Sequence, residues 1–248
     1  MKAAGVGFKP DVVLLAYYAG NDLTDVKNNP LFRSRSGANK ATGVAINRNH
    51  YFYQRSYLYQ FVRQKAQPIL LKYYYFDYEE AAASGVHPAI IEDAKNQKIN
   101  PWLLKLSVKD KNYLLENILM ETSEDMKVWE KVKEILIEIH DVCKKIESQL
   151  VIVVFPRSIQ INRSHFEFYE QLAFNLDERT LESNKPQQLF MEFCEQRGIE
   201  CLDILPAFKA RAREEFYLNK DDHLNVKGNQ MANELIMSFL LEKTVIGD

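Results

Sequence analysis

The chain has 248 residues, of which 46% are hydrophobic and 27% charged, as is usual for a globular protein with a substantial core. Its formal net charge of −2 provides no global basic field, which argues against nucleic acid or an anionic membrane surface as a partner. No apolar run approaches the length of a membrane span, and no signal-peptide pattern follows Met1.

The three cysteines, Cys143, Cys194 and Cys201, lack the spacing of metal ligands, and nothing else in the sequence requires a cofactor. Buried, unreactive thiols are the favoured interpretation. Cys194 and Cys201 flank a predicted helix-to-strand turn, so a pairing between these two stays open.

The first predicted element is a buried parallel strand over Val12 to Tyr17. Its apolar run is continuous and follows Pro10, as expected of a strand that is covered on both faces. The strand ends in the turn sequence Ala19-Gly20-Asn21-Asp22. These polar residues therefore fall at the carboxyl end of a strand, where open α/β sheets place their sites.

The middle of the chain, about residues 28 to 121, is less regular and is predicted to be a large insertion after the first strand. Within it, apolar residues at helical spacing predict a tyrosine-rich helix from Ser56 to about Tyr75. Packing against the main sheet is the favoured role of this apolar stripe. A lid, or an aromatic platform for a sugar, is the alternative.

The rest of the chain alternates between helices and strands. A long helix capped by Thr122 or Ser123 has an apolar face that runs from Met126 to Ile146. The elements predicted after it are a strand from Leu150 to Phe155 stopped by Pro156, a helix from Gln187 to Arg197 ended by Gly198, a strand from Ile199 to Ile204, and helices from Phe208 to Glu215 and from Val226 to Leu241. This order predicts one α/β domain, residues 1–248, with a parallel sheet and helices on its faces.

Near the C-terminus, Asp221-Asp222-His223-Leu224-Asn225 combines residues that can carry acyl-transfer chemistry. An Asp two residues before a His can fix the tautomer of the imidazole, and the imidazole can then take a proton from a hydroxyl. The structural alternative is a helix start, with Asn225 as the cap and the acidic residues near the positive end of the helix. The local sequence pattern alone favours neither of these two interpretations over the other.

Asn21-Asp22 has a similar pair of interpretations. Asn at the end of a buried strand can donate an N–H to an oxyanion, with Asp22 as structural support beside it. Both residues also stabilise turns by bonding to nearby backbone. The position directly behind a buried strand strengthens the functional interpretation.

Taken together, the two ends of the chain resemble the SGNH (GDSL-type) hydrolase superfamily. Asn21-Asp22 matches the Asn-Asp block of that family, and Asp221 and His223 match its catalytic Asp and His. The strand from Val151 to Pro156, with Gln160 downstream, is also similar to members related to alginate acetyltransferases. The resemblance implies a flavodoxin-like, three-layer parallel sheet and a serine esterase or acyltransferase that acts on esters, carbohydrate O-acetyl groups among them. It also implies a secreted, periplasmic or membrane-anchored protein, whose targeting signal would lie upstream.

The chain departs from the family pattern at several positions. Many members place the Asp three residues before the His, where this chain has Lys220, and Asp222 could compete with Asp221 for the role. The Gly-Asp-Ser block with the nucleophile, expected on an earlier strand, has no counterpart, nor has the oxyanion glycine of the second block. Ser34, Ser36 and Ser158 are the serines considered instead, and none has the context of a nucleophile turn. The resemblance therefore implies a domain without its first strand and without serine-dependent activity.

Two other functions remain open. The first is a non-catalytic member of the family that binds a glycan or a partner protein. The second is a metal-dependent phosphoesterase that uses Asp22, Asp221, Asp222 and His223, although His50, His87, His140 and His165 are isolated in the sequence.

Overall fold

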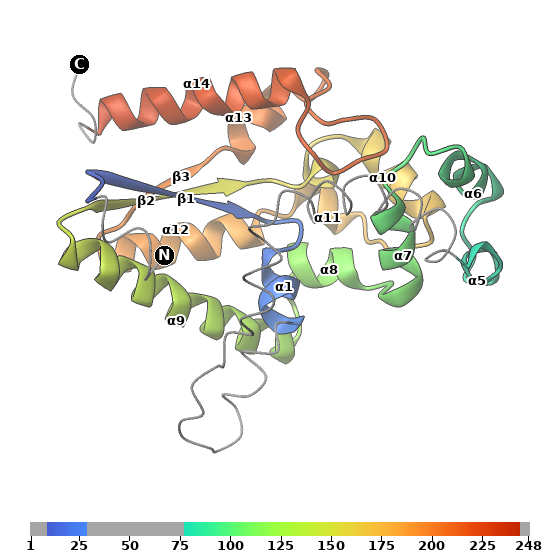
Figure 1. Cartoon of the computed structure of the whole chain (residues 1–248), viewed down its shortest axis with the longest axis horizontal. Coiled ribbons are helices and arrows are strands. Elements are labelled where there is room, and N and C mark those ends of the chain that lie inside the picture. The colour runs from blue at the N-terminus through green and yellow to red at the C-terminus, as the bar shows by residue number, and fades with distance from the viewer. Residues whose placement is uncertain (1–8, 29–76, 244–248) are drawn as a thin grey trace, which may run out of the picture.

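The computed structural model describes residues 9–28 and 77–243. Three strands form a parallel sheet in the order β1 (Val12–Tyr18), β2 (Gln149–Phe155) and β3 (Glu200–Asp203). This is a mixed α/β architecture, as the alternating elements predict (Figure 1). All three predicted strands are present, with ends that differ by a few residues.

The register of β1 and β2 brings two loops together at one edge of the sheet. Tyr18 pairs with Phe155, the last residue of each strand, and the Ala19 N–H donates to the Phe155 carbonyl over 2.9 Å. The turn that follows β1 therefore lies beside the segment that follows β2. Because the strands are parallel, the loop after β3 leaves from the same edge.

Helices cover the sheet on both faces. α9 (Ser123–Lys145) and α12 (Lys185–Arg197) lie on one face, and α13 (Leu205–Ala210) and α14 (Val226–Glu242) lie on the other (Figure 1). On the α9 side, Trp129 and Phe190 meet edge to face at 4.9 Å between ring centroids in a core that includes Ile152 and Val154 of β2. On the α14 side, Val153 packs with Phe208 and Phe216. β2 is thus buried on both faces, which accounts for its continuous apolar sequence.

The start of α9 and the end of α12 have the expected local chemistry. Thr122 caps α9 in a capping box with Asp125. Gly198 ends α12 in the left-handed conformation, with φ of 64°.

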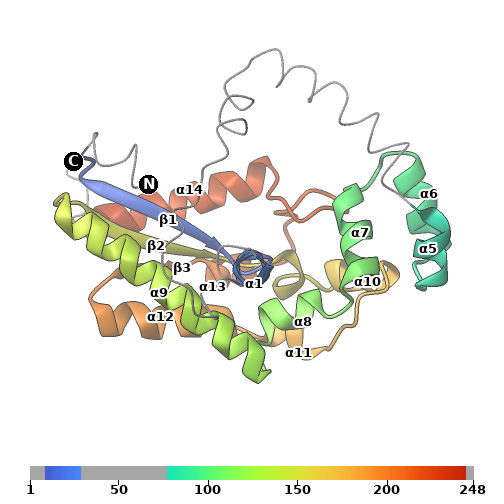
Figure 2. The same cartoon turned by 60° about the horizontal axis from the view of Figure 1, so that its bottom comes forward.

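The middle of the chain is more regular than the sequence predicts. After α1 (Asp22–Asn28), its described part forms four short helices, α5 (Tyr78–Ala83), α6 (Pro88–Lys95), α7 (Pro101–Lys109) and α8 (Tyr113–Ile118). Side chains of Asp77, His87 and Asn100 cap three of them, and proline occupies the first turn of α6 and α7. Figure 2 shows α5, α6 and α7 together at one end of the molecule, beyond the strands. The apolar residues of these short helices form a separate core with Phe166 and Tyr169. The predicted helix from Ser56 to about Tyr75 lies outside the described residues.

Some boundaries and elements differ from expectation. The helix predicted from Phe208 to Glu215 is α13, which begins at Leu205 with proline in its first turn and ends at Ala210. η3 (Ser158–Gln160), α10 (Arg163–Gln171) and α11 (Arg179–Glu182) are not predicted from the sequence, because they are too short for a periodic apolar pattern to stand out.

Two further expectations concern the thiols and the membrane. All three cysteines are free, and Cys143 and Cys194 are buried as expected, whereas Cys201 is partly exposed. Within residues 9–28 and 77–243, no helix combines the length and the apolar character needed to cross a bilayer.

Candidate functional site

The turn after β1 is fixed by its own side chains. Asp22 Oδ2 accepts from the Tyr18 N–H over 2.8 Å, which closes the turn and starts α1. Gly20 is required here, because a Cβ at that position would lie 2.3 Å from the Tyr18 ring. Asn21 Nδ2 donates to Asp25 Oδ2 over 3.0 Å, whereas Asn21 Oδ1 is buried without a hydrogen-bond partner. Asn21 therefore has one amide hydrogen uncommitted to Asp25 and one unsatisfied acceptor.

The loop before α14 carries the Asp–His pair. Asp221 Oδ1 lies 2.6 Å from His223 Nδ1, and it also accepts from the backbone N–H groups of Asp222 and His223. The His223 side chain is 73% exposed, so its orientation depends on Asp221. Lys220 has a φ of 56°, a left-handed turn that leads into the pair. The geometry assigns to Asp221 the contact for which Asp221 and Asp222 could compete.

The base of the same loop is pinned to α14. The Leu218 N–H donates to the His223 carbonyl over 2.8 Å, and the Asn225 N–H donates to Phe216 over 2.9 Å. Asn225 also caps α14 by accepting from the Gly228 N–H over 2.9 Å. The helix-start interpretation and the Asp–His interpretation are therefore both realised, by different residues of the motif.

Arg157, two residues beyond the end of β2, joins these two segments, and it is not among the candidate site residues predicted from the sequence. Its side chain is 1% exposed, and it donates to the Gly20 carbonyl and to the Asp222 carboxylate. The rings of Tyr113 and Tyr169 lie 5.4 and 5.2 Å from its guanidinium carbon. A polar residue just beyond the carboxyl end of a buried strand is the sequence signal that could have identified it.

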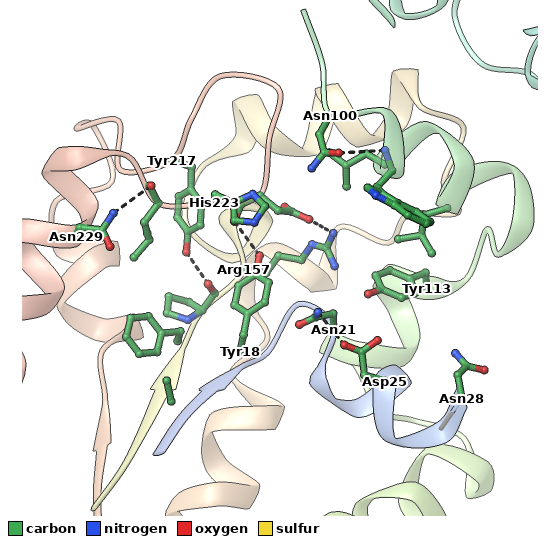
Figure 3. Close-up of a pocket in the computed structure, with 18 of the residues that line it drawn as sticks. Tyr18, Asn21, Asp25, Asn28, Asn100, Tyr113, Arg157, Tyr217, His223 and Asn229 are labelled. Atoms are coloured by element: carbon green, nitrogen blue, oxygen red, sulfur yellow. Dashed lines mark hydrogen bonds and ion pairs between the residues drawn. The ribbon is translucent and has the colours of Figure 1, made fainter. Parts of the chain in front are cut away.

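The side chains surround a cavity of about 890 Å³ at the carboxyl edge of the sheet. Figure 3 shows Tyr18, Arg157 and His223 around it, with Asn21 on the turn after β1. Further residues of its wall are Asn28, Asn100, Trp102, Tyr113, Tyr217 and Asn229. The sequence-predicted residues Asn21 and His223 thus share one cavity.

Ionisation in this region is set by burial and by the Arg157–Asp222 pair. Burial and the nearby Asp222 carboxylate raise the pKa of Tyr18 well above its usual range, so its hydroxyl stays a donor and bonds to the Asp222 carbonyl over 3.2 Å. Burial opposes the charge of Arg157, but Asp222, Tyr18 and Tyr113 together more than offset it and hold the pKa of the guanidinium above its usual value. Burial raises the pKa of Asp22, against the lowering effect of the Tyr18 N–H bond.

Ser158 is completely buried and does not serve the imidazole. Its hydroxyl lies 3.2 Å from the Tyr169 hydroxyl and donates to Asp222 Oδ1 over 3.4 Å. Ser34 and Ser36 lie outside the described residues. Within the described part of the chain, no serine hydroxyl is hydrogen-bonded to the His223 ring.

The carboxylates proposed for a metal site have other partners. Asp22 accepts from Tyr18, Asp221 contacts His223, and Asp222 is paired with Arg157. Across residues 9–28 and 77–243, no group of three or more His, Cys, Asp or Glu side chains is arranged to hold a metal ion.

In comparisons with known proteins, no protein-family model, curated protein or solved structure matches the chain.

Proposed function

We propose that this chain supplies the Asp–His half of an acyl-transfer site of the SGNH hydrolase type and acts on ester bonds. The observation that carries the proposal is the 2.6 Å contact between Asp221 Oδ1 and Nδ1 of His223, which lies in the wall of a large cavity. The flavodoxin-like arrangement of a larger sheet is part of the same proposal. Its support is the parallel order of the three strands and the helices on both faces.

Each residue has a defined role in this proposal. Asp221 keeps the proton of the imidazole on Nδ1, which leaves the Nε2 lone pair of His223 to take a proton from a hydroxyl. Asn21 donates its second amide hydrogen to the oxygen on which negative charge develops. Asp22 supports the turn through the Tyr18 N–H.

The group that attacks the ester is not assigned to a residue of the described chain. Because no described serine is bonded to His223, we propose that His223 activates either water or a hydroxyl of an acceptor substrate. General-base catalysis of this kind contributes roughly 10²–10⁴-fold, so we expect slow turnover. Acylated carbohydrates are the substrate class that the family resemblance favours. A cavity of about 890 Å³ is large enough for a sugar residue with its ester.

The test is hydrolysis of 4-nitrophenyl acetate by the purified chain and by His223→Ala and Asp221→Asn. We expect a slow rate that falls roughly 100-fold in His223→Ala and stays unchanged in His140→Ala, a control that removes an imidazole from α9. A fluorophosphonate reagent, which labels nucleophilic serines, should neither inhibit the reaction nor modify the chain. A rate that is identical in wild type and His223→Ala would overturn the proposal.

A second candidate function is glycan binding without chemistry, which the exposed Trp102 favours. Trp102 is 57% exposed and lines the cavity beside Asn100, an arrangement suited to stacking on a sugar ring and bonding to its hydroxyls. Calorimetry with acetylated and deacetylated glycans separates the two functions. Binding that is lost in Trp102→Ala but kept in His223→Ala, in the absence of turnover, would favour the binding module.

A further inference from the structure

The guanidinium of Arg157 connects the two segments that carry the candidate chemistry. One Nη donates to the Gly20 carbonyl in the turn that carries Asn21, and the other donates to Asp222 in the loop that carries His223. Figure 3 shows the side chain between these segments, among the residues that line the cavity. No other described side chain bonds to both segments through one charged group.

The position of Arg157 is itself tightly fixed. Its N–H donates to Gln160 Oε1 over 2.9 Å, and Gln160 Nε2 donates to the Ser183 carbonyl over 2.9 Å. With two tyrosine rings against the guanidinium, the side chain has little freedom to follow a movement of either segment. It acts as a fixed point to which both segments are attached.

Asp222 transmits this constraint to the Asp–His pair. Its carboxylate holds Arg157, and its backbone N–H donates to Asp221 Oδ1 over 2.6 Å. Because the Asp221 carboxylate orients His223, a shift of Asp222 would change the presentation of the imidazole. The two adjacent aspartates would therefore have separate tasks, with Asp222 as the anchor and Asp221 as the orienter.

Stability is a weak explanation for such a pair. Taking two charges out of water costs several kcal/mol per ion, and apolar residues of similar volume often replace a buried ion pair without loss of stability. The Nε of Arg157 is also buried without a partner, as is Asn21 Oδ1, a cost that an apolar core would not carry.

We propose that Arg157 is a positioning residue, which sets the placement of the His223 loop relative to the Asn21 turn through Gly20 and Asp222. The proposal rests on the acyl-transfer function for its purpose. Its mechanical content, one buried cation that couples two loops, can be tested without any substrate.

The experiment compares the full-length wild type with Arg157→Met/Asp222→Leu. We expect a folded protein in which backbone amides of segments 19–25 and 218–225 exchange with solvent roughly tenfold faster, with β2 unchanged. Acylation of His223 by diethyl pyrocarbonate, followed by mass spectrometry, should also slow by roughly tenfold as the Asp221 contact loosens. Arg163→Met/Glu178→Leu makes the same exchange of residue types in an exposed pair, and it should change neither readout.

A second variant covers the case in which the double replacement does not fold. Arg157→Lys keeps the charge but lacks the planar fork that reaches two acceptors. We expect it to fold and to lose exchange protection in at least one of the two segments. The proposal is overturned if every folded variant retains wild-type exchange in both segments and a wild-type rate of His223 acylation.

The ester assay adds an arm that separates this proposal from the proposed function. If wild type turns over the ester, kcat of the double variant should fall by roughly 100-fold with KM little changed. If wild type shows no turnover dependent on His223, the acyl-transfer proposal fails, and the exchange and acylation measurements still decide the role of Arg157.

Discussion

Two neighbouring segments at the carboxyl edge of the sheet differ in how they are buried. Arg157 to Gln160, after β2, is buried throughout although three of its four residues are polar. The loop with Asp221 and His223 is less buried: the imidazole is 73% exposed and the Asp221 side chain 23%. Burial thus gives the first segment a fixed geometry, while exposure leaves the second able to meet a substrate.

This contrast implies that loss of a single side chain costs the fold more after β2 than at the exposed imidazole. When a buried polar group loses its hydrogen-bond partner, the full desolvation penalty of that group remains. An exposed group in the same position forms a hydrogen bond to water instead. Substitutions after β2 should therefore unfold or loosen the protein. Substitutions at the exposed pair should change chemistry and leave the fold intact.

The largest expected effect is that of Arg157→Ala. It leaves the Asp222 carboxylate, 13% exposed, without its cation, and loss of one partner from a buried ion pair costs about 3–5 kcal/mol. Urea unfolding followed by circular dichroism measures it. The matched control is Arg163→Ala, whose exposed pair with Glu178 is screened by water and should contribute little to stability. Equal losses for the two variants would contradict the contrast between the segments.

The sequence predicts the strands and long helices better than it predicts the different burial of the two segments. β1, β2, α9, α12 and α14 follow from apolar runs and helical spacing, since both patterns are local. Asn21 and His223 are found because they follow a strand or precede a helix, and the structure brings both to one cavity. The Asp221–His223 contact needs only a two-residue spacing, which a sequence displays directly.

Arg157 is missed for a physical reason. Its partners, Gly20 and Asp222, are 137 and 65 residues away along the chain, so no local pattern contains the interaction. A lone arginine after Phe-Pro also looks like an ordinary solvated loop residue. The short helices of the middle section are missed in part for the same reason, because their core with Phe166 and Tyr169 forms only in the folded chain.

A second prediction concerns the base of the exposed loop. Gly228 lies in the first turn of α14, where a Cβ would be 2.2 Å from the Phe216 carbonyl oxygen and 2.9 Å from a Leu224 methyl. Since the first contact is with backbone, Gly228→Ala must displace the loop and should destabilise the protein by about 1–3 kcal/mol. The midpoint of urea unfolding measures it. An alanine that is tolerated at no cost would show that the loop is not pinned at its base.

A third prediction uses pH to examine the border between the two segments. Burial lowers the pKa of His165, against the opposing effect of Asp222 and Glu215, and its ring meets Tyr217 edge to face at 5.7 Å. The unfolded chain, with an ordinary pKa of 6.5, therefore binds this proton more tightly than the folded chain. Stability from His165 is present above that value and is lost as the pH falls below it.

The variant His165→Phe isolates this contribution. Between about pH 7 and about pH 5, wild type should lose more stability than the variant, as measured by the difference in unfolding midpoints. His140→Phe is the comparison variant. Burial also lowers the pKa of His140, but this residue is on α9, which contributes no residue to the wall of the cavity. If His165→Phe loses as much stability as wild type over this pH range, the pH dependence arises from a group other than His165.

The smallest effect on stability is expected where the chemical effect is largest. His223→Ala removes a side chain that is 73% exposed, so it should stay within about 0.5 kcal/mol of wild-type stability. Asp221→Asn keeps the shape of a side chain that is 23% exposed and retains the Oδ1 acceptor for the two loop N–H groups, so its loss should also be small. The same variants should abolish His223-dependent ester hydrolysis, because the imidazole is lost in one and its orienting charge in the other. Unfolding midpoints and ester turnover are measured on the same preparations. A loss of several kcal/mol in His223→Ala would mean that the imidazole stabilises the fold. An exposed side chain that serves only in chemistry makes too few contacts for its removal to cost so much.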